Sequence, residues 1–396
     1  MPVEPSGDPL DQVFADLGTQ ESVRRLESDM FTRLAGAARQ VVICGCAQLG
    51  RETLAAARAA GLEVVACADN NSSLWGAMLD GIPIISPSDA VEIHNRDALF
   101  VVAIYNGASP RKQLRDLGCE RIVPYPAFFW EFARYMPGES RLELPHRIVA
   151  RVDDIRAGYR CLGDDKSRRE FAAQIAWRCS LDYDRLPIPD SASDIYFPPD
   201  LMRLSGEEVL VDCGAFDGDS IRLFSEKTSG SFRHIHAIEP DATNRRSLER
   251  YVSSLSSRER DRISVLPFGV SDHNDTVHFN TSGTAASRMT TDESTDLIEC
   301  RRLDGLLAGF PPTIIKMDIE GSEPDALWGA TETIRTARPI LAVCAYHKCE
   351  HLWTLPAIMS AALPEYQIFL RRYAEECWET VYYAIPPERL VHGDAQ

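Results

Sequence analysis

Short apolar strands alternate with helical segments twice along this chain of 396 residues, and this alternation restricts its fold more than any other feature. The first series covers about residues 40–124, and the second runs from about residue 209 to residue 385. Strands that alternate with helices form parallel sheets with right-handed crossover connections. We therefore predict an α/β chain that contains two doubly wound domains.

The expected strands are β-branched apolar runs, as in parallel sheets that are covered on both faces. In the first series we expect strands at residues 40–44, 63–68 and 99–104, with helices at residues 52–60 and 111–117. In the second series we expect seven strands, at residues 209–213, 234–238, 263–268, 313–317, 340–345, 367–371 and 380–385. The predicted domains are a Rossmann-like domain (1–140), a helical bridge with a proline-rich loop (141–200) and a second Rossmann-like domain (201–396).

The acidic composition narrows the expected partners. Lys and Arg total 42 and Asp and Glu total 59, so the net charge is −17. Such a surface repels nucleic-acid phosphates and anionic lipid headgroups, so we expect a small-molecule substrate and neither nucleic acid nor a membrane as partner. The chain opens without a recognisable signal peptide, and no apolar run approaches the roughly 20 residues that span a bilayer. We expect a cytoplasmic protein with reduced cysteines. Whether the chain forms a homo-oligomer stays open.

The turn after the first strand of the second series combines acids with glycines. It reads Asp212-Cys-Gly214-Ala215-Phe-Asp217-Gly218. Glycines let the backbone approach a ligand, and the N-terminus of the following helix offers free N–H groups. An acid at the strand end would repel a phosphate, so the turn favours a cationic group such as the aminocarboxypropyl end of S-adenosylmethionine. We count Ala215 and Asp217 among the cofactor-binding candidates, although Asp212 alone is equally compatible with a helix cap.

The next three strands of this series also end near acids. The second ends at Glu239, about 20 residues after Gly218, an interval at which an acid can accept hydrogen bonds from ribose hydroxyls. Asp272 follows the third strand, where an adenine edge could be recognised. The fourth strand ends in Lys-Met-Asp318-Ile-Glu320-Gly. Because open α/β sheets bind ligands at the carboxyl ends of their strands, the order of these acids predicts a single site.

With these motifs, residues from about 165 to 385 resemble the FkbM-type methyltransferases, which use S-adenosylmethionine. The matching sequences are VLVDCGAFDGD, HAIEPD, IIKMDIEGSEPDALWGA, ILAVCAYHKCEHLW and FLRRY with ETVYYAIP, of which KMDIEG is the most specific. The resemblance implies a seven-stranded class I methyltransferase domain with S-adenosylmethionine as cofactor. It assigns five cofactor contacts: Asp212, Gly214 and Gly218 at the methionine end, Glu239 at the ribose and Asp272 on the adenine side.

Three residues are the expected catalytic groups. Methyl transfer requires a group that takes the proton of the acceptor, and Asp318 is expected to face the acceptor. Glu320 could form a carboxylate pair with Asp318, help to hold a divalent cation, or cap the following helix. His347, after the fifth strand, could serve as a general base near neutral pH. A zinc site within residues 344–351 is disfavoured because its ligands would be too crowded. We assign no metal ligands, and a requirement for a divalent cation stays open.

Ser287 and Arg288 are the expected substrate contacts of the second domain. They belong to a loop of small and polar residues between the third and fourth strands. Loops at this position commonly close over an acceptor, although a plain surface loop would have the same composition.

The first series carries a degenerate dinucleotide fingerprint, Cys-Gly45-Cys-Ala47-Gln-Leu-Gly50, and Asp69 follows about 20 residues later. The glycine turn, with no acid at its own strand end, favours a phosphate. The segment resembles Rossmann-like domains found ahead of sugar-modifying acyltransferases and beside sugar methyltransferases. This resemblance implies a nucleotide-linked sugar bound by Gly45, Gly50 and Asp69. A scaffold or dimerisation domain without a ligand fits the same residues.

Together these features favour an S-adenosylmethionine-dependent methyltransferase that methylates a hydroxyl of a sugar or of a glycosylated small molecule. Methylation of a nitrogen or carbon atom stays an alternative. The same scaffold supports all three reactions, and the loops that form the acceptor pocket do not reveal the acceptor atom in the sequence. A non-catalytic protein that binds nucleotide sugars is the alternative from another functional class.

Overall fold

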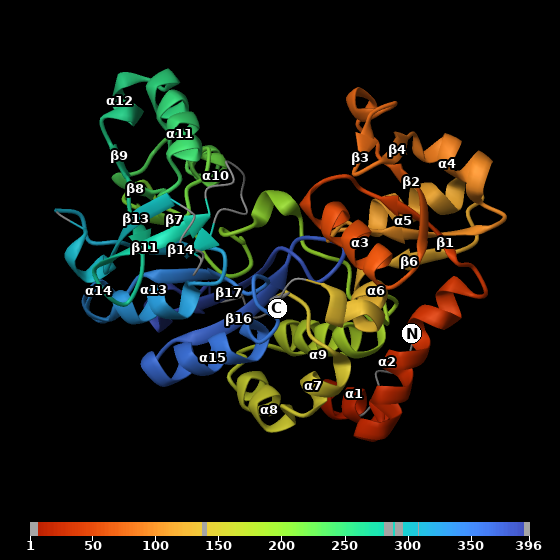
Figure 1. Cartoon of the computed structure of the whole chain (residues 1–396). Coiled ribbons are helices and arrows are strands. Elements are labelled where there is room, and N and C mark those ends of the chain that lie inside the picture. The colour runs from red at the N-terminus through yellow and green to blue at the C-terminus, as the bar shows by residue number, and fades with distance from the viewer. Residues whose placement is uncertain (1–6, 137–140, 281–287, 290–295, 308, 392–396) are drawn as a thin grey trace. The chain divides into compact units, whose positions relative to one another are not determined.

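The computed structural model describes residues 7–136, 141–280, 288–289, 296–307 and 309–391 (Figure 1). The chain forms two compact units. Unit 1 comprises Met1–Asp153, Arg169–Ile188 and Ala374–Trp378, and unit 2 comprises Asp154–Arg168, Pro189–Tyr373 and Glu379–Gln396. The segment 141–200, which the sequence predicts to be a bridge, is therefore divided between the two units.

Unit 1 contains a six-stranded sheet with the order β3-β4-β2-β1-β5-β6. All neighbouring strands are parallel except the pair β3 and β4. This confirms the predicted parallel α/β architecture of the first half, and β5 is buried along its whole length, as a strand covered on both faces must be. The strands are β1 (Gln40–Cys44), β2 (Glu63–Ala68), β3 (Met78–Leu79), β4 (Ile82–Ile85), β5 (Ala98–Val102) and β6 (Ile122–Pro124).

Three helices of the first half begin at side chains that accept hydrogen bonds from free backbone N–H groups. Asp8, Thr19 and Ser86 cap α1, α2 and α4 in this way. The helices are α1 (Pro9–Leu17), α2 (Gln20–Ala35), α3 (Gln48–Ala59), α4 (Pro87–His94), α5 (Ala108–Asp116), α6 (Tyr125–Phe132) and α7 (Pro145–Val149). Two further helices, α8 (Val152–Arg160) and α9 (Asp165–Ser180), contain boundaries between the units.

Unit 2 contains a seven-stranded sheet with the order β16-β17-β15-β14-β7-β8-β9. β17 is antiparallel to both of its neighbours and the other pairs are parallel. All seven predicted strands are present, with ends that differ from the prediction by at most two residues. They are β7 (Val209–Cys213), β8 (His234–Ile238), β9 (Ile263–Leu266), β14 (Ile314–Met317), β15 (Ile340–Cys344), β16 (Gln367–Arg372) and β17 (Thr380–Ile385).

Six helices follow the strands of this sheet (Figure 1). They are α10 (Asp219–Lys227), α11 (Ala242–Ser254), α12 (Ser257–Arg260), α13 (Glu323–Gly329), α14 (Thr331–Ala337) and α15 (His351–Ala362). Short 3-10 helices occur at Ser72–Leu74, Ala133–Tyr135, Ala192–Asp194, Leu303–Gly305 and Pro387–Arg389. None of the helices in the described ranges is both long and apolar enough to cross a membrane.

A small second sheet in unit 2 was not predicted. Its order is β10-β13-β11-β12, and β11 is antiparallel to β13. In β13 only the alternate residues Ile298 and Cys300 are buried, and they form a small apolar cluster with Phe279 of β11. Such half-polar strands resemble loops in composition, and only the alternation of Val277 and Phe279 with polar residues signals them. The strands are β10 (Gly269–Val270), β11 (Asp275–Asn280), β12 (Arg288–Met289) and β13 (Asp296–Arg301).

Gly158 marks a close approach between α8 and α15 inside unit 2. A Cβ atom at this position would lie 2.5 Å from the carbonyl oxygen of Trp353. Neither backbone segment can move without disturbing its own helix, so the contact needs a residue without a side chain.

We expect Gly158→Ala to destabilise the chain by about 1–3 kcal/mol, because the steric clash outweighs the helix-forming advantage of alanine. The free energy of unfolding in urea measures this loss. The matched control is Gly305→Ala, since no atom lies within 4 Å of a Cβ at Gly305. A Gly158→Ala variant as stable as this control would show that the two helices do not pack this closely.

Candidate active site

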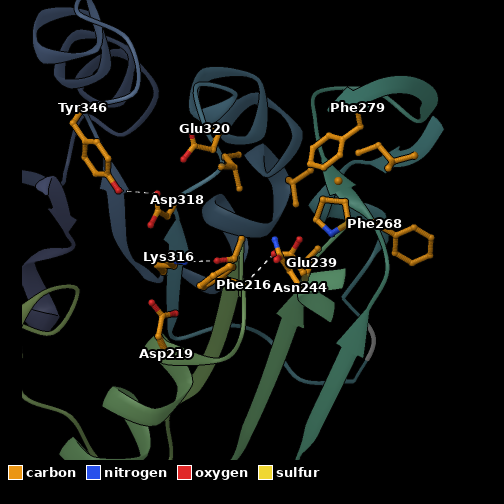
Figure 2. Close-up of a pocket in the computed structure, with 17 residues that line it drawn as sticks. Phe216, Asp219, Glu239, Asn244, Phe268, Phe279, Lys316, Asp318, Glu320 and Tyr346 are labelled. Carbon is orange, nitrogen blue, oxygen red and sulfur yellow. Dashed lines mark hydrogen bonds between the residues drawn. The ribbon is translucent and has the colours of Figure 1, made fainter. Parts of the chain in front are cut away.

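A cavity lies at the carboxyl edge of the seven-stranded sheet in unit 2 (Figure 2). Its volume is about 790 Å³, part of which is open to solvent, and small-molecule sites have volumes of this order. The lining residues follow β7, β8, β14 and β15 or belong to the small sheet. The strand ends that the sequence predicts to form one site therefore do meet.

The glycine turn after β7 is held close to the loop after β14. Gly214 and Gly218 have φ angles of 81° and 90°, in the left-handed region that favours glycine. A Cβ atom on Gly214 would lie 2.0 Å from the carbonyl oxygen of Asp318. Gly214 is thus required for the approach of the two loops, and it also lines the cavity.

Asp212 and Lys316 form a buried ion pair beneath this turn. They are direct neighbours in the pairing of β7 with β14, and Lys316 Nζ lies 2.9 Å from Asp212 Oδ1. Lys316 Nζ also donates a hydrogen bond of 2.6 Å to the carbonyl oxygen of Gly214. Burial alone would lower the pKa of Lys316, but the charges of Asp212 and Asp318 raise it above its ordinary value. Lys316 is therefore a permanent cation.

This pairing differs from the expected contact between Asp212 and the amine of a cofactor. Asp212 is fully buried and does not line the cavity, and it also accepts a hydrogen bond from Ser220 Oγ. Its charge is compensated inside the protein, by the lysine that lies directly across the strand pair. The acid of this turn that does line the cavity is Asp219, which the sequence analysis missed.

Glu239 lies in the middle of the cavity wall, beside Asn244 (Figure 2). Its Oε2 accepts a hydrogen bond of 2.9 Å from the backbone N–H of Phe216, and its Oε1 accepts one of 2.8 Å from that of Asp241. Burial raises the pKa of Glu239 to about 7, although the two backbone hydrogen bonds oppose this change. The structure places this carboxyl at the strand end, where the sequence predicts a ribose contact.

The far end of the cavity is apolar. Phe268, Val270, Phe279 and Ile298 line it, and Figure 2 shows the two phenylalanines at the end away from Asp318. Asp272, the predicted adenine contact, does not line the cavity. It is largely exposed, and its carboxylate is paired with His273, which lowers the pKa of Asp272. The aromatic side chains of Phe268 and Phe279, and not Asp272, line this end of the cavity.

Asp318 is the most densely contacted acid of the cavity. Its Oδ2 accepts a hydrogen bond of 2.8 Å from the hydroxyl of Tyr196, and its Oδ1 accepts one of 3.3 Å from Tyr346. His347 Nε2 lies 3.2 Å from the same Oδ1. Burial opposes the ionised form, but the contact with His347 and the charge of Lys316 hold the pKa of Asp318 well below its usual range. Asp318 is therefore ionised.

The other two predicted catalytic residues, Glu320 and His347, lie close to Asp318 and to each other. Glu320 lines the cavity, and its Oε1 lies 3.5 Å from His347 Nε2. It is not a helix cap, because Ser322 is the residue that precedes the first turn of α13. His347 is buried and does not line the cavity. The three predicted residues thus meet around one imidazole, and only the two acids reach the cavity.

Strained backbone conformations concentrate around this cavity. Tyr196, Phe216 and Glu320 have φ angles of 66°, 46° and 55°, which residues other than glycine adopt rarely. Phe216 and Glu320 line the cavity, and Tyr196 contacts Asp318. Glu379, with a φ of 50°, has a pKa raised to about 7 by burial and by the charge of Asp318. Such strain is typical of functional sites, where the surroundings hold a side chain in a required position.

Ala215 and Asp217 lie outside the cavity lining. Ala215 is buried, and Asp217 forms an ion pair of 2.5 Å with Arg222. Arg288 begins β12, and Ser287 lies outside the described residues. Among the side chains that the structure describes, no group of three or more His, Cys, Asp or Glu residues is arranged to hold a metal ion.

Unit 1 has a smaller cavity at the carboxyl ends of β1 and β2, lined in part by Gly45 and Asp69. Asp69 Oδ2 accepts a hydrogen bond of 2.9 Å from the backbone N–H of Cys46, inside the glycine turn. The carboxylate occupies one N–H group of the turn and places a negative charge beside it, which disfavours an anion at this N–H group. Gly50 packs against the turn, since a Cβ there would lie 1.9 Å from the carbonyl oxygen of Gly45.

Glu239 should make the stability of the unliganded chain fall as the pH rises. Because its pKa is raised from 4.5 to about 7, the folded chain binds this proton more tightly than the unfolded chain. The stabilisation is complete below about pH 4.5 and is lost as the pH rises through 7. For one group the loss is at most roughly 3 kcal/mol.

Urea unfolding at several pH values between 5 and 8 measures this effect. Glu239→Gln should remove the contribution of Glu239 and make the curve less steep, whereas Gly305→Ala, which alters no titratable group, should keep the slope of the original chain. Parallel curves for Glu239→Gln and the original chain would contradict the raised pKa.

Known proteins are similar to this chain in sequence and fold. The family model of the methyltransferase FkbM domain matches residues 212–370. The chain is similar to the crystal structure of a methyltransferase FkbM from Methylobacillus flagellatus KT, with 26% identity and a TM-score of 0.74 over 95% of this chain and 100% of that chain. The match to a precorrin-6y C5,15-methyltransferase from Geobacter metallireducens GS-15 has 12% identity and a TM-score of only 0.29, over 47% of this chain and 83% of that chain. No curated protein matches the sequence. The chain thus contains a methyltransferase FkbM domain at residues 212–370, and it is an enzyme that transfers methyl groups.

Proposed function

We propose that this methyltransferase uses S-adenosylmethionine to methylate a hydroxyl group of a sugar or of a glycosylated small molecule. The observation that carries the proposal is the order of chemical groups along the cavity of unit 2. Acidic side chains lie at one end, a buried carboxyl with a raised pKa lies in the middle, and aromatic side chains lie at the other end (Figure 2).

The cavity residues fit the three parts of S-adenosylmethionine in sequence. The carboxylates of Asp219 and Asp318 suit its cationic sulfonium and amine end. Glu239 can accept hydrogen bonds from the ribose hydroxyls. Phe268 and Phe279 offer an apolar surface for the adenine ring.

When bound, S-adenosylmethionine would supply a methyl carbon whose bond to sulfur breaks, with the electron pair staying on sulfur, as the acceptor oxygen bonds to that carbon. The residues of the chain must align the acceptor and take the proton that its hydroxyl loses. Asp318 is the ionised carboxylate in the cavity that can take this proton. The hydroxyls of Tyr196 and Tyr346 hold both of its oxygens in place.

A neutral acceptor that carries hydroxyls fits this end of the cavity better than an anionic one. Asp219, Asp318 and Glu320 all line it, and Lys316 is already paired with Asp212. A phosphate beside these acids would be repelled. The net charge of −17 supports a small molecule rather than a nucleic acid as substrate.

For unit 1 we propose binding of the sugar part of a nucleotide-linked sugar at Gly45, Gly50 and Asp69. Asn70 and Gln113 line the same cavity and hydrogen-bond each other through their amides. These amides and the Asp69 carboxylate can recognise hydroxyls. The position of Asp69 at the glycine turn argues against a contact between that turn and a phosphate.

We expect calorimetry to show binding of S-adenosylmethionine to the full chain. Glu239→Ala should weaken the affinity at least about tenfold, because one lost charged hydrogen bond costs roughly 1.5–3 kcal/mol. Asp318→Asn should bind S-adenosylmethionine but reduce methyl transfer by about 10²–10⁴-fold, the usual contribution of a general base.

Mass spectrometry of glycosides and nucleotide sugars incubated with S-adenosylmethionine identifies the methylated acceptor. Glu208→Gln, at the opposite edge of the sheet, serves as the control that should bind and transfer normally. A folded original chain that binds no S-adenosylmethionine would disprove the proposal.

A further inference from the structure

We propose that Glu323 is a positioning residue that keeps His347 as a fixed imidazolium, and that His347 in turn orients Asp318, so that Asp318 and not His347 takes the proton of the acceptor. The orientation of Asp318 matters for catalysis only if the proposed function is correct. The protonation state of His347 can be measured without it.

His347 lies at the centre of three carboxylates. Its Nδ1 is 2.7 Å from Oε1 of Glu323. Its Nε2 is 3.2 Å from Oδ1 of Asp318 and 3.5 Å from Oε1 of Glu320. The imidazole side chain is 1% exposed, so water does not replace these partners. Both ring nitrogens therefore face carboxylate oxygens.

This arrangement determines which nitrogens carry a proton. An ionised carboxylate only accepts hydrogen bonds, and a neutral imidazole has one N–H donor and one unprotonated acceptor nitrogen. A neutral His347 would turn a lone pair toward a carboxylate at one of its two nitrogens. Only the imidazolium carries a proton at both nitrogens, with Nδ1 hydrogen-bonded to Glu323 and Nε2 close to Asp318 and Glu320. A general base needs an unprotonated nitrogen, so His347 in this geometry cannot fill the role that its sequence position suggests.

The charges on every element around His347 support the same state. Asp318 and Glu320 follow β14, Glu323 begins α13, and Glu379 precedes β17, while Lys316 and Lys348 are the cations of this region. Burial alone would favour the neutral ring, but the three contacting acids raise the pKa of His347 well above its usual range. His351 in α15, which faces the other oxygen of Glu323 at 3.4 Å, has its pKa lowered to about 4 by burial. His351 is therefore neutral and does not replace the charge of His347.

Glu323 is itself fixed by the loop that carries Asp318 and Glu320. It is fully buried, and its Oε1 accepts hydrogen bonds of 3.1 Å from the backbone N–H of Ile319 and of 3.4 Å from that of Gly321. The carboxylate thus connects the loop to His347, and His347 returns to the loop at Asp318. These contacts between the loop, Glu323 and His347 hold Asp318 at one position relative to the cavity. The sequence analysis did not assign Glu323 a role.

Nitrogen NMR of the full chain, labelled at histidine and free of ligand, tests the protonation directly. Between pH 6 and 9 both ring nitrogens of His347, assigned by their loss in His347→Gln, should keep the shifts of an imidazolium. In Glu323→Gln the ring should lose its proton within this range, and in the control Glu208→Gln it should not. A neutral His347 in the original chain at pH 8 would overturn the proposal, whether or not Glu323→Gln folds.

The pH dependence of methyl transfer distinguishes His347 as an orienting cation from His347 as a general base, because the two roles predict opposite changes of activity with pH. Once the acceptor is known, Glu323→Gln should lose activity about tenfold per pH unit above the new pKa of His347, because the cation that orients Asp318 is lost. Glu323→Asp keeps the charge and should restore part of the activity at high pH. If the activity of Glu323→Gln instead rose with pH through this pKa, His347 would be the base and the proposal would be wrong. If no acceptor is methylated, the proposed function fails, while the NMR result still decides the state of His347.

Discussion

The buried ammonium of Lys316 is the interaction on which the site depends. Burial of a charge costs several kcal/mol unless partners compensate it. Here Asp212 lies at 2.9 Å, the carbonyl oxygen of Gly214 at 2.6 Å, and the ring of Tyr196 has its centroid at 5.2 Å. These partners come from the strand β7, the turn that follows it and the segment before β7. One cation therefore connects the central strand pair to the glycine turn.

From Lys316 a row of alternating charges leads to the acceptor end of the cavity. Asp212, Lys316, Asp318, His347 and Glu323 are in turn negative, positive, negative, positive and negative. Each inner charge lies between opposite charges, and their attraction offsets the free-energy cost of burying the row in a medium of low dielectric constant. Asp318 is the member of this row whose carboxylate reaches the cavity. The chain thus holds an ionised carboxylate beside the cavity while the charges behind it are compensated.

The main sheet could be predicted from the sequence because its strands are continuous apolar runs. The bounds of β7, β8 and β17 agree with the prediction residue by residue. The small sheet was missed because β13 buries only alternate side chains. Strand order could not be predicted in enough detail to pair Asp212 with Lys316, which lies more than 100 positions further along the chain. The directions of side chains were equally inaccessible, as Asp69 and Glu323 show: both acids turn toward backbone N–H groups of neighbouring loops.

A crystal structure of the chain with S-adenosylhomocysteine bound tests the assignment of this cavity most directly. We predict that the adenine lies against Phe268 and Phe279, that the ribose hydroxyls donate to Glu239, and that the sulfur lies at the end of the cavity that holds Asp318. A ligand bound in the reverse direction, with its sulfur at the aromatic end, or bound outside this cavity, would contradict the assignment.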